Sequence, residues 1–298
     1  MRHRHNRLAH ISFAIAVAVL LTSSSWSQTA GPDSVVVVPV ANMYSAAAEN
    51  SDVVSQAIIG SNVVTLEVHG NWAKVRTADQ YTGWMLGDAL RKLGESGVYG
   101  KSGTVVQIEA LFANLYGETD VTSHKPVLTV PFESRLEVVA PGKGDDARWL
   151  QVRLPDQRIA WIQSGDINRD PQPLTIAQSI ALAKRFLGLP YLWGGRSSYG
   201  YDCSGFTQML VRSRGITMPR DADVQAAWEG VESVDRKDLR AGDLLFFGSA
   251  ADKITHTAMY IGDGEFIHAT THNHPVVQIS RLDDEPWTRI LVACRRVK

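Results

Sequence analysis

The hydrophobic pattern of the chain changes near residue 170. Between residues 33 and 168, apolar and polar positions alternate over short stretches such as "VVTLEVHG" and "LEVVAPG", each broken by Gly, Pro or Asp. A period of two predicts half-buried β-strands joined by tight turns. "NRDPQPLT" (168–175), with its Pro and polar residues, is typical of a linker, and the pattern beyond it is different.

The alternating region contains an internal repeat. "GNWAKVRTADQYTGWML" (70–86) parallels "ARWLQVRLPDQRIAWIQ" (147–163), and "VANMYSAAAEN" (40–50) parallels "LFANLYGETD" (111–120). In each copy a second Trp follows the first after twelve positions, at Trp72 and Trp84 and at Trp149 and Trp161. Such self-similarity predicts two copies of one small all-β unit, over residues 31–98 and 102–168. The Gly-Trp ending and the repeat length resemble bacterial SH3-like barrels, which often accompany cell-wall enzymes.

Helical periodicity appears in the C-terminal region, residues 172–298. Thr175 and Gln178 form a capping box before "IAQSIALAKRFLG", whose apolar residues share one helical face up to Leu187, with Gly188 placed to end the helix. "SGFTQMLVRSRG" predicts a second helix. The later segments "DLLFFG", "HTAMYIG", "EFIHAT", "VVQISR" and "ILVACRR" alternate. A helix pair followed by an antiparallel sheet indicates the α+β class.

The N-terminus has the pattern of a secretory signal peptide over residues 1–27. Three arginines precede the apolar run "ISFAIAVAVLL" (11–21), which is followed by small and polar residues. The run is short for a membrane span, which needs about 20 apolar residues. We therefore expect an exported protein, periplasmic or secreted, without stable membrane insertion after cleavage; an uncleaved anchor is the alternative. The net charge of −1 and the lack of a basic stripe make nucleic acid an unlikely partner.

The chain has only two cysteines, Cys203 and Cys294. In an oxidising compartment they could form one disulfide. The stretch "GYDCSGFTQML" suggests another use. With Asp202 as the N-cap, Cys203 lies in the first turn of a helix, where the helix dipole favours a thiolate. Backbone N–H groups at the helix start could hold an oxyanion, so the layout suits acyl transfer.

A thiol that acts as a nucleophile needs a base, and "THTAMYIGDGEFIHA" (255–269) offers His256 and His268 on two strands. A two-residue turn would project the two imidazoles from opposite faces of the hairpin. A three-residue connection, Gly262–Gly264, places them diagonally on one face, with Gly264 in the left-handed region. We expect the three-residue connection.

The histidines of "HATTHNHP" (His268, His272 and His274) could also be read as metal ligands. No acidic residue is interleaved and the stretch resembles a solvated loop, so we expect neither a metal nor another cofactor.

Four blocks, "PYLWGGRSSYGYDCSGF", "MPRDADVQ", "AGDLLFF" and "ITHTAMYIGDGEFIHA", together resemble the NlpC-type cysteine peptidases, papain-like enzymes of bacterial cell walls. The resemblance covers residues 174–298 and implies a papain-like catalytic domain. It also implies that Cys203 is the nucleophile, His256 the general base and His268 the orienting third residue. Tyr191 matches a family tyrosine on the oxyanion side.

With two leading SH3-like barrels, the chain resembles the γ-D-glutamyl-L-diamino-acid endopeptidases. These enzymes cut murein peptides between D-Glu and the diamino acid, generally when L-Ala has a free amine, and their first barrel walls the cleft. The resemblance implies substrate contacts from Asp202, Ser204, Asp221, Arg220, Tyr81 and Glu49. Among these, Asp221 would pair with the L-Ala ammonium, whereas Arg220 would meet a carboxylate or form a salt bridge with Asp221. Ala222 departs from the hydroxyl residue of many relatives, which puts one substrate hydrogen bond in doubt.

Two other functions fit the same residues. One is an amidase or acyltransferase that acts on other wall or lipid molecules. The other is a murein-binding scaffold in which the peptidase domain is inert.

Overall fold

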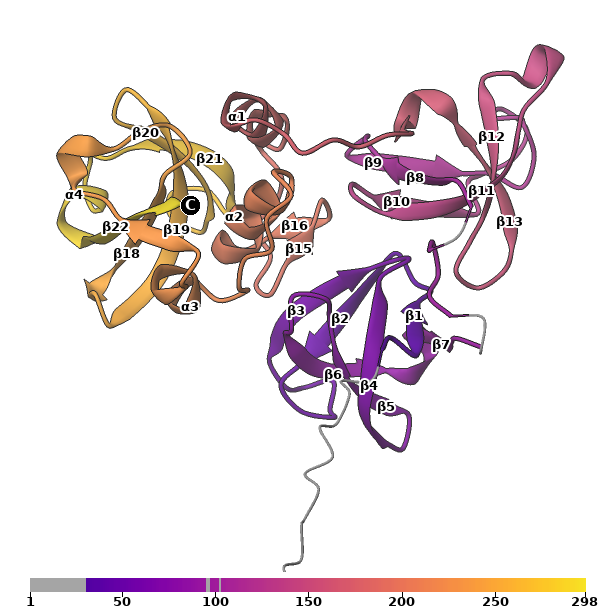
Figure 1. Cartoon of the computed structure of the whole chain (residues 1–298), viewed down its shortest axis with the longest axis horizontal. Helices are drawn as coiled ribbons and strands as arrows, with labels where there is room; N and C mark the ends of the chain where they lie inside the picture. The colour runs from indigo at the N-terminus through magenta and orange to yellow at the C-terminus, as the bar shows by residue number, and fades with distance from the viewer. Residues whose placement is uncertain (1–30, 95–96, 102) are drawn as a thin grey trace, which may run out of the picture. The chain divides into compact units, whose positions relative to one another are not determined.

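The structure is a computed structural model that describes residues 31–94, 97–101 and 103–298, so the predicted signal peptide lies outside the described residues. It confirms the α+β class, and within these ranges the α-helices all follow residue 175 (Figure 1). None of the helices in these ranges is long and apolar enough to cross a membrane.

The first all-β unit is one sheet with the strand order β3-β2-β6-β5-β4-β1-β7. Its strands are β1 (Ser34–Val36), β2 (Val40–Tyr44), β3 (Val53–Ile58), β4 (Asn62–His69), β5 (Trp72–Arg76), β6 (Thr82–Leu86) and β7 (Leu90–Lys92), with a 3-10 turn at Gly87–Ala89. Alternate residues point inward, so Met43, Val75 and Met85 are fully buried in its core.

The second all-β unit has a five-stranded sheet, β13-β12-β11-β8-β14, and the pair β9-β10. Its strands are β8 (Val105–Ile108), β9 (Phe112–Leu115), β10 (Leu128–Pro131), β11 (Arg135–Pro141), β12 (Trp149–Arg153), β13 (Ile159–Gln163) and β14 (Ile167–Asn168), with 3-10 turns at Gly144–Asp146 and Ser164–Asp166.

The internal repeat is visible in how the aromatic residues pack. In the first unit Tyr44 meets Trp72 edge-on with ring centroids 5.4 Å apart, and in the second Tyr116 meets Trp149 in the same way at 5.5 Å. The turn after each first Trp strand also matches, because Gln80 (φ 66°) and its counterpart Gln157 (φ 76°) are both left-handed. The two units therefore share these features of local structure, as expected for an internal repeat.

The C-terminal domain has four α-helices and a six-stranded antiparallel sheet, β17-β22-β18-β19-β20-β21, in the described part of the chain. The helices are α1 (Ile176–Arg185), α2 (Cys203–Arg212), α3 (Ala222–Ala227) and α4 (Trp287–Ile290), with a 3-10 turn at Arg236–Asp238. The strands of the six-stranded sheet are β17 (Val231–Ser233), β18 (Leu244–Ala250), β19 (Lys253–Gly262), β20 (Glu265–Thr270), β21 (Val276–Arg281) and β22 (Leu291–Val297). Strands β15 (Arg196–Ser197) and β16 (Gly200–Tyr201) pair with each other.

Helix α1 begins as the sequence predicts and ends earlier. Thr175 and Gln178 form the capping box, but the last helical residue is Arg185, two residues before the predicted Leu187. The next residues turn away because Gly188 is left-handed, with φ at 85°.

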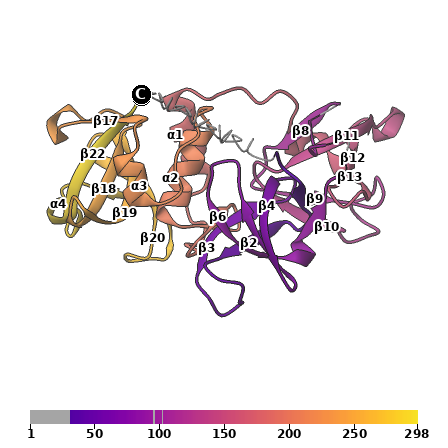
Figure 2. The same cartoon turned by 60° about the horizontal axis from the view of Figure 1, so that its bottom comes forward.

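The sheet buries both of its faces. Phe246, Met259 and Ile267 join the core beneath α1 and α2, whereas Phe247 and Phe266, at alternate positions, pack with Trp287 of α4 on the other face. Helix α2 packs against β19 and β20, and both views show it beside β19 (Figures 1 and 2). The first residue of α2 is thereby placed next to the strand that carries His256.

Candidate active site

Cys203 is the first residue of α2, and the local sequence dictates its position. The carboxylate of Asp202 caps the helix, since its Oδ1 accepts a hydrogen bond from the backbone N–H of Gly205 at 2.7 Å. Gly205 has to be glycine because a Cβ there would lie 2.2 Å from the carbonyl oxygen of Gly195. The helix start is thus packed tightly against the preceding loop.

The β19–β20 hairpin brings the two histidines to one face of the sheet, as predicted. Tyr260 pairs with Phe266, so His268 lies opposite Ala258 and diagonal to His256. The predicted register is therefore correct.

The connection that produces this register differs from the prediction. Gly262 pairs with Glu265, which leaves a two-residue turn of Asp263 (φ 52°) and Gly264 (φ 78°), so only the left-handed Gly264 was predicted correctly. A β-bulge between Tyr260 and Gly262 supplies the extra residue that we expected in the loop.

A row of hydrogen bonds crosses three strands at this point. His256 Nε2 lies 2.8 Å from His268 Nδ1, and His268 Nε2 lies 3.0 Å from Ser280 Oγ on β21. If both imidazoles are neutral and protonated at Nε2, His256 donates to His268 and His268 donates to Ser280. This arrangement leaves Nδ1 of His256 as an unprotonated base.

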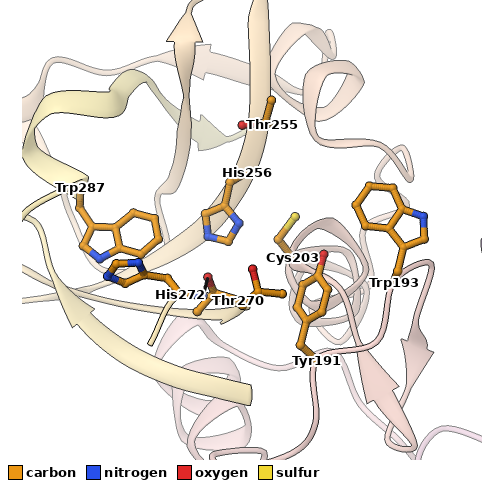
Figure 3. A pocket seen from close by; sticks show the side chains of 9 residues that line it. Tyr191, Trp193, Cys203, Thr255, His256, Thr270, His272 and Trp287 are labelled. Carbon is orange, nitrogen blue, oxygen red and sulfur yellow. Dashed lines mark hydrogen bonds between the residues drawn. The ribbon is translucent and has the colours of Figure 1, made fainter. Parts of the chain in front are cut away.

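Cys203 and His256 face one another across a pocket of about 520 Å³. The sulfur lies between the His256 imidazole and the hydroxyl of Tyr191 (Figure 3). The pocket is lined by Tyr191, Trp193, Cys203, Thr255, His256, Thr270, Thr271, His272 and Trp287. A carbonyl group that enters this pocket would meet a thiol, a base and a hydroxyl donor.

Trp287 shields the histidine row from solvent. It is 5% exposed, and its ring centroid lies 5.4 Å from that of His256, 4.9 Å from that of His268 and 5.2 Å from that of His272. Such a cover strengthens the buried hydrogen bonds beneath it, because water cannot compete for them.

Burial keeps the thiol and the imidazole neutral at rest. Burial raises the pKa of the Cys203 thiol to about 11, and the nearby Asp202 carboxylate adds to this effect. Burial also lowers the pKa of His256 to about 4. The thiolate that the helix dipole was expected to favour is therefore opposed by desolvation, and the proton has to move from sulfur to His256 during the reaction.

Arg220 is paired with Asp202, not with Asp221 as one reading of the sequence had it. Its guanidinium is 3% exposed and donates to Asp202 Oδ2 at 2.5 Å, to Ser204 Oγ at 2.7 Å and to Ser55 Oγ of β3 at 3.2 Å. The charges of Asp202 and Arg220 are thus matched within the protein, directly beside Cys203.

The first barrel contributes Tyr81 to the same region. Burial, followed by the charge of Asp221, raises the pKa of the Tyr81 hydroxyl to about 12. Burial likewise raises the pKa of Asp221, although Arg220 opposes the shift. Glu49 is exposed on the β2–β3 loop, without a hydrogen bond or ion pair among the described residues, and its contact with substrate stays a prediction.

Sequence reasoning missed Ser280 and Trp287. A signal for Ser280 was present in the spacing, because His268 follows His256 by twelve residues and Ser280 follows His268 by twelve residues. In the β20–β21 hairpin Phe266 pairs with Ser280. This second hairpin repeats the diagonal relationship of the first. Nothing local marks Trp287, which reaches the site from α4.

The disulfide reading of the sequence is wrong. Cys203 and Cys294 are both free thiols, and Cys294 is buried in the core below Trp287. The described residues contain no group of three His, Cys, Asp or Glu side chains that could hold a metal ion. Of the three histidines considered for that role, His268 has both ring nitrogens in the hydrogen-bonded row.

Comparison with known proteins gives consistent matches along the chain. Residues 188–296 match the NlpC/P60 family, residues 43–90 the bacterial dipeptidyl-peptidase Sh3 domain, and residues 99–168 the GW (Gly-Tryp) dipeptide domain.

Similar proteins match most of the chain. A γ-D-glutamyl-L-lysine dipeptidyl-peptidase of Bacillus cereus is 35% identical over 72% of this chain and 66% of its own length. One of Bacillus subtilis is 29% identical over 81% of this chain and 80% of its own. The crystal structure of an NlpC/P60 family protein from Bacillus cereus superposes with a TM-score of 0.77 at 27% identity, covering 89% of this chain and 99% of that one.

Proposed function

The chain belongs to the NlpC/P60 family of cell-wall cysteine peptidases, and we propose that it hydrolyses the γ-D-glutamyl–diamino acid bond of murein peptides whose L-Ala carries a free amine. The names of the Bacillus relatives support the choice of bond. The observation that carries the proposal is that Cys203 and His256 line one pocket, with His268 and Ser280 hydrogen-bonded in a row behind the imidazole.

In the proposed mechanism His256 is the base and Cys203 the nucleophile. Nδ1 of His256 takes the thiol proton as Sγ bonds to the γ-carbonyl carbon of D-Glu, whose oxygen becomes an oxyanion near the start of α2 and Tyr191. The Nε2–H of the resulting His256 imidazolium donates a hydrogen bond to Nδ1 of His268, and this bond holds the imidazolium in place. No tautomer change is needed in the row.

Two further proton transfers complete the cycle. The C–N bond breaks as the imidazolium of His256 protonates the leaving amine of the diamino acid, and a thioester to Cys203 remains. His256 next takes a proton from water, the hydroxide adds to the thioester, and the thiol leaves with the proton returned by His256. The products are L-Ala-D-Glu and the peptide that begins with the diamino acid.

Restriction to a free amine would follow from Asp221 and from Tyr81 of the first barrel. Asp221 is a partly buried carboxylate next to the hydroxyl of Tyr81, and burial destabilises its charge in the free protein. An ammonium group would compensate that charge, whereas an acylated nitrogen brings no charge and adds bulk beside Tyr81. Asp221 and Tyr81 would thus recognise the amino end of L-Ala-D-Glu.

We also propose that the enzyme is exported, since murein lies outside the cytoplasm and residues 1–27 have the pattern of a signal peptide. Recovery of the protein outside the cytoplasm, with the mature N-terminus near residue 28, tests this; a cytoplasmic protein that keeps residues 1–27 would refute it.

Two defined peptides test the proposed activity. L-Ala-γ-D-Glu-diaminopimelate should yield two fragments by mass spectrometry, and its N-acetylated form should be cut at least tenfold more slowly. Cys203→Ser should abolish cleavage, and Asp221→Asn should reduce the preference for the free amine. Equal cleavage of both peptides would favour the alternative of an amidase with broader acyl specificity, and no cleavage of either would leave the scaffold reading.

A further inference from the structure

The pocket continues beyond His256 into a region that the proposed mechanism does not use. Trp287 and His272 lie on one side of the His256 imidazole, and Cys203 lies on the other (Figure 3). We propose that this region binds the side chain of the leaving diamino acid, and that His272 selects a side chain that ends in a carboxylate over one that ends in an ammonium alone. The inference rests on the proposed function, because it concerns the other half of the same substrate.

The chemistry of proton transfer fixes the position of the leaving group. The amine receives its proton from His256, so the residue that leaves has to lie on the imidazole side of the Cys203 sulfur. The acyl group lies on the opposite side of the sulfur, where Figure 3 shows the hydroxyl of Tyr191, on which the charges of Asp202 and Arg220 act. The side chain of the leaving residue therefore extends toward Trp287 and His272.

The lining of this region suits an anion. None of the described side chains that line the pocket is acidic. Its polar groups are the His272 imidazole, which has no hydrogen-bond partner among the described residues, and the hydroxyls of Thr255, Thr270 and Thr271. A carboxylate would receive hydrogen bonds from such donors, strengthened by charge if His272 is protonated. An ammonium group would find no anion to replace its lost hydration.

His272 is held in place by its own loop. Its backbone N–H donates to Thr270 Oγ1 at 3.1 Å, and its carbonyl oxygen accepts from Gln278 Nε2 at 2.7 Å. Its ring meets the ring of Trp287 edge-on, with a centroid separation of 5.2 Å and an interplanar angle of 80°. A group fixed in this way loses little entropy when it binds a ligand.

These features distinguish two diamino acids. The side chain of meso-diaminopimelate ends in a carbon that bears both a carboxylate and an ammonium group, whereas that of L-lysine ends in an ammonium group alone. His272 can bind the former through its carboxylate. The opposite preference would arise if the face of Trp193, which is 70% exposed, held the ammonium group.

The test compares L-Ala-γ-D-Glu-meso-diaminopimelate with L-Ala-γ-D-Glu-L-Lys in wild type, His272→Ala and His274→Ala. His274 is the matched control, because it is exposed on the same loop and does not line the pocket. We expect kcat/KM to be at least tenfold higher for the diaminopimelate peptide in wild type and in His274→Ala. His272→Ala should lower it about tenfold for that peptide alone, so that cleavage of the lysine peptide reports that the variant is folded. A diaminopimelate peptide amidated at the terminal carboxyl should behave like the lysine peptide.

Other outcomes separate the two proposals. If wild type prefers the lysine peptide or cuts both equally, or if His272→Ala slows both in parallel, the selective subsite is refuted while the peptidase function stands. If wild type cuts neither peptide, the proposed function fails and this inference fails with it.

Discussion

Ser280 should control the tautomer of the catalytic histidines, although it is too far along the row to touch the substrate. Its Oγ is the partner of His268 Nε2 at 3.0 Å, and His268 is fully buried. In Ser280→Ala the Nε2–H form of His268 loses its acceptor, so the Nδ1–H form gains population. That form cannot accept from His256 Nε2, and His256 would in turn carry its proton on Nδ1, where it cannot act as a base toward Cys203.

The size of the effect follows from the buried donor. An unsatisfied buried N–H costs about 1–3 kcal/mol, and 1.4 kcal/mol corresponds to a factor of about ten in rate or population. We therefore expect kcat/KM of Ser280→Ala to fall about tenfold. KM should change little, because Ser280 is not among the residues that line the pocket.

Peptide cleavage followed by product mass provides the assay, with ¹⁵N NMR of the imidazoles as a readout of the tautomer. Ser280→Thr keeps the hydroxyl and should restore most of the rate, whereas Ser249→Ala is the control, since Ser249 is exposed on β18. If Ser280→Ala matches Ser249→Ala in both rate and tautomer, the reasoning about the row is wrong.

Three further variants probe burial around Cys203. The folded chain protonates His256 only near pH 4 and the unfolded chain near pH 6.5, so the free energy of unfolding should fall by about 3 kcal/mol as the pH drops through this window. Urea unfolding at several pH values should show that loss in wild type and a smaller loss in His256→Gln, because burial also lowers the pKa of His268, which still takes up a proton on unfolding. Arg220→Met leaves the buried Asp202 carboxylate without its ion-pair partner and should lower the free energy of unfolding by about 3–5 kcal/mol, partly recovered by adding Asp202→Asn. Gly205→Ala places a methyl group 2.2 Å from the carbonyl oxygen of Gly195, so the melting temperature of the variant should drop. The rate at which Cys203 is alkylated should change as well.

Sequence reasoning succeeded where one local rule decides the outcome. The capping box at Thr175 and Gln178 needs only two side chains and the backbone between them. The side of the hairpin that carries His268 depends on whether the connection adds an odd or an even number of residues. A bulge and a longer loop have the same effect on that parity, which is why the face was predicted correctly and the turn was not.

Sequence reasoning failed where the result depends on which residues, far apart in the sequence, come into contact. Arg220 and Asp221 are neighbours in sequence, but Asp221 is extended (φ −90°, ψ 144°), and successive side chains of extended backbone point to different sides. Arg220 instead reaches Asp202. The expectation of a thiolate at Cys203 neglected burial for a related reason. The helix dipole that favours a thiolate can be read from the sequence, but the burial that raises the pKa of the thiol cannot.

Helix α2 links the catalytic residues to the first barrel. Cys203 is its first residue, and one turn later Gln208 donates from Nε2 to Asp79 of the first barrel at 2.9 Å and accepts from Arg196 Nε at 2.7 Å. Arg196 closes the triangle with an ion pair to Asp79 at 3.2 Å. Burial alone would raise the pKa of Asp79, but Arg196 and its hydrogen bonds hold it below the usual value.

A buried ion pair of this kind adds little stability compared with apolar packing, but it tolerates only one geometry. Asp79 lies on the β5–β6 turn, two residues before Tyr81, so the geometry imposed on Asp79 also fixes the hydroxyl that lies beside Asp221. The helix that presents the thiol therefore also sets the position of the barrel residue proposed to recognise the amino end of the substrate. If the proposed function is correct, the distance between the scissile bond and the site that recognises the amine is set by a single rigid helix, and the charged residues between the two domains keep that distance fixed.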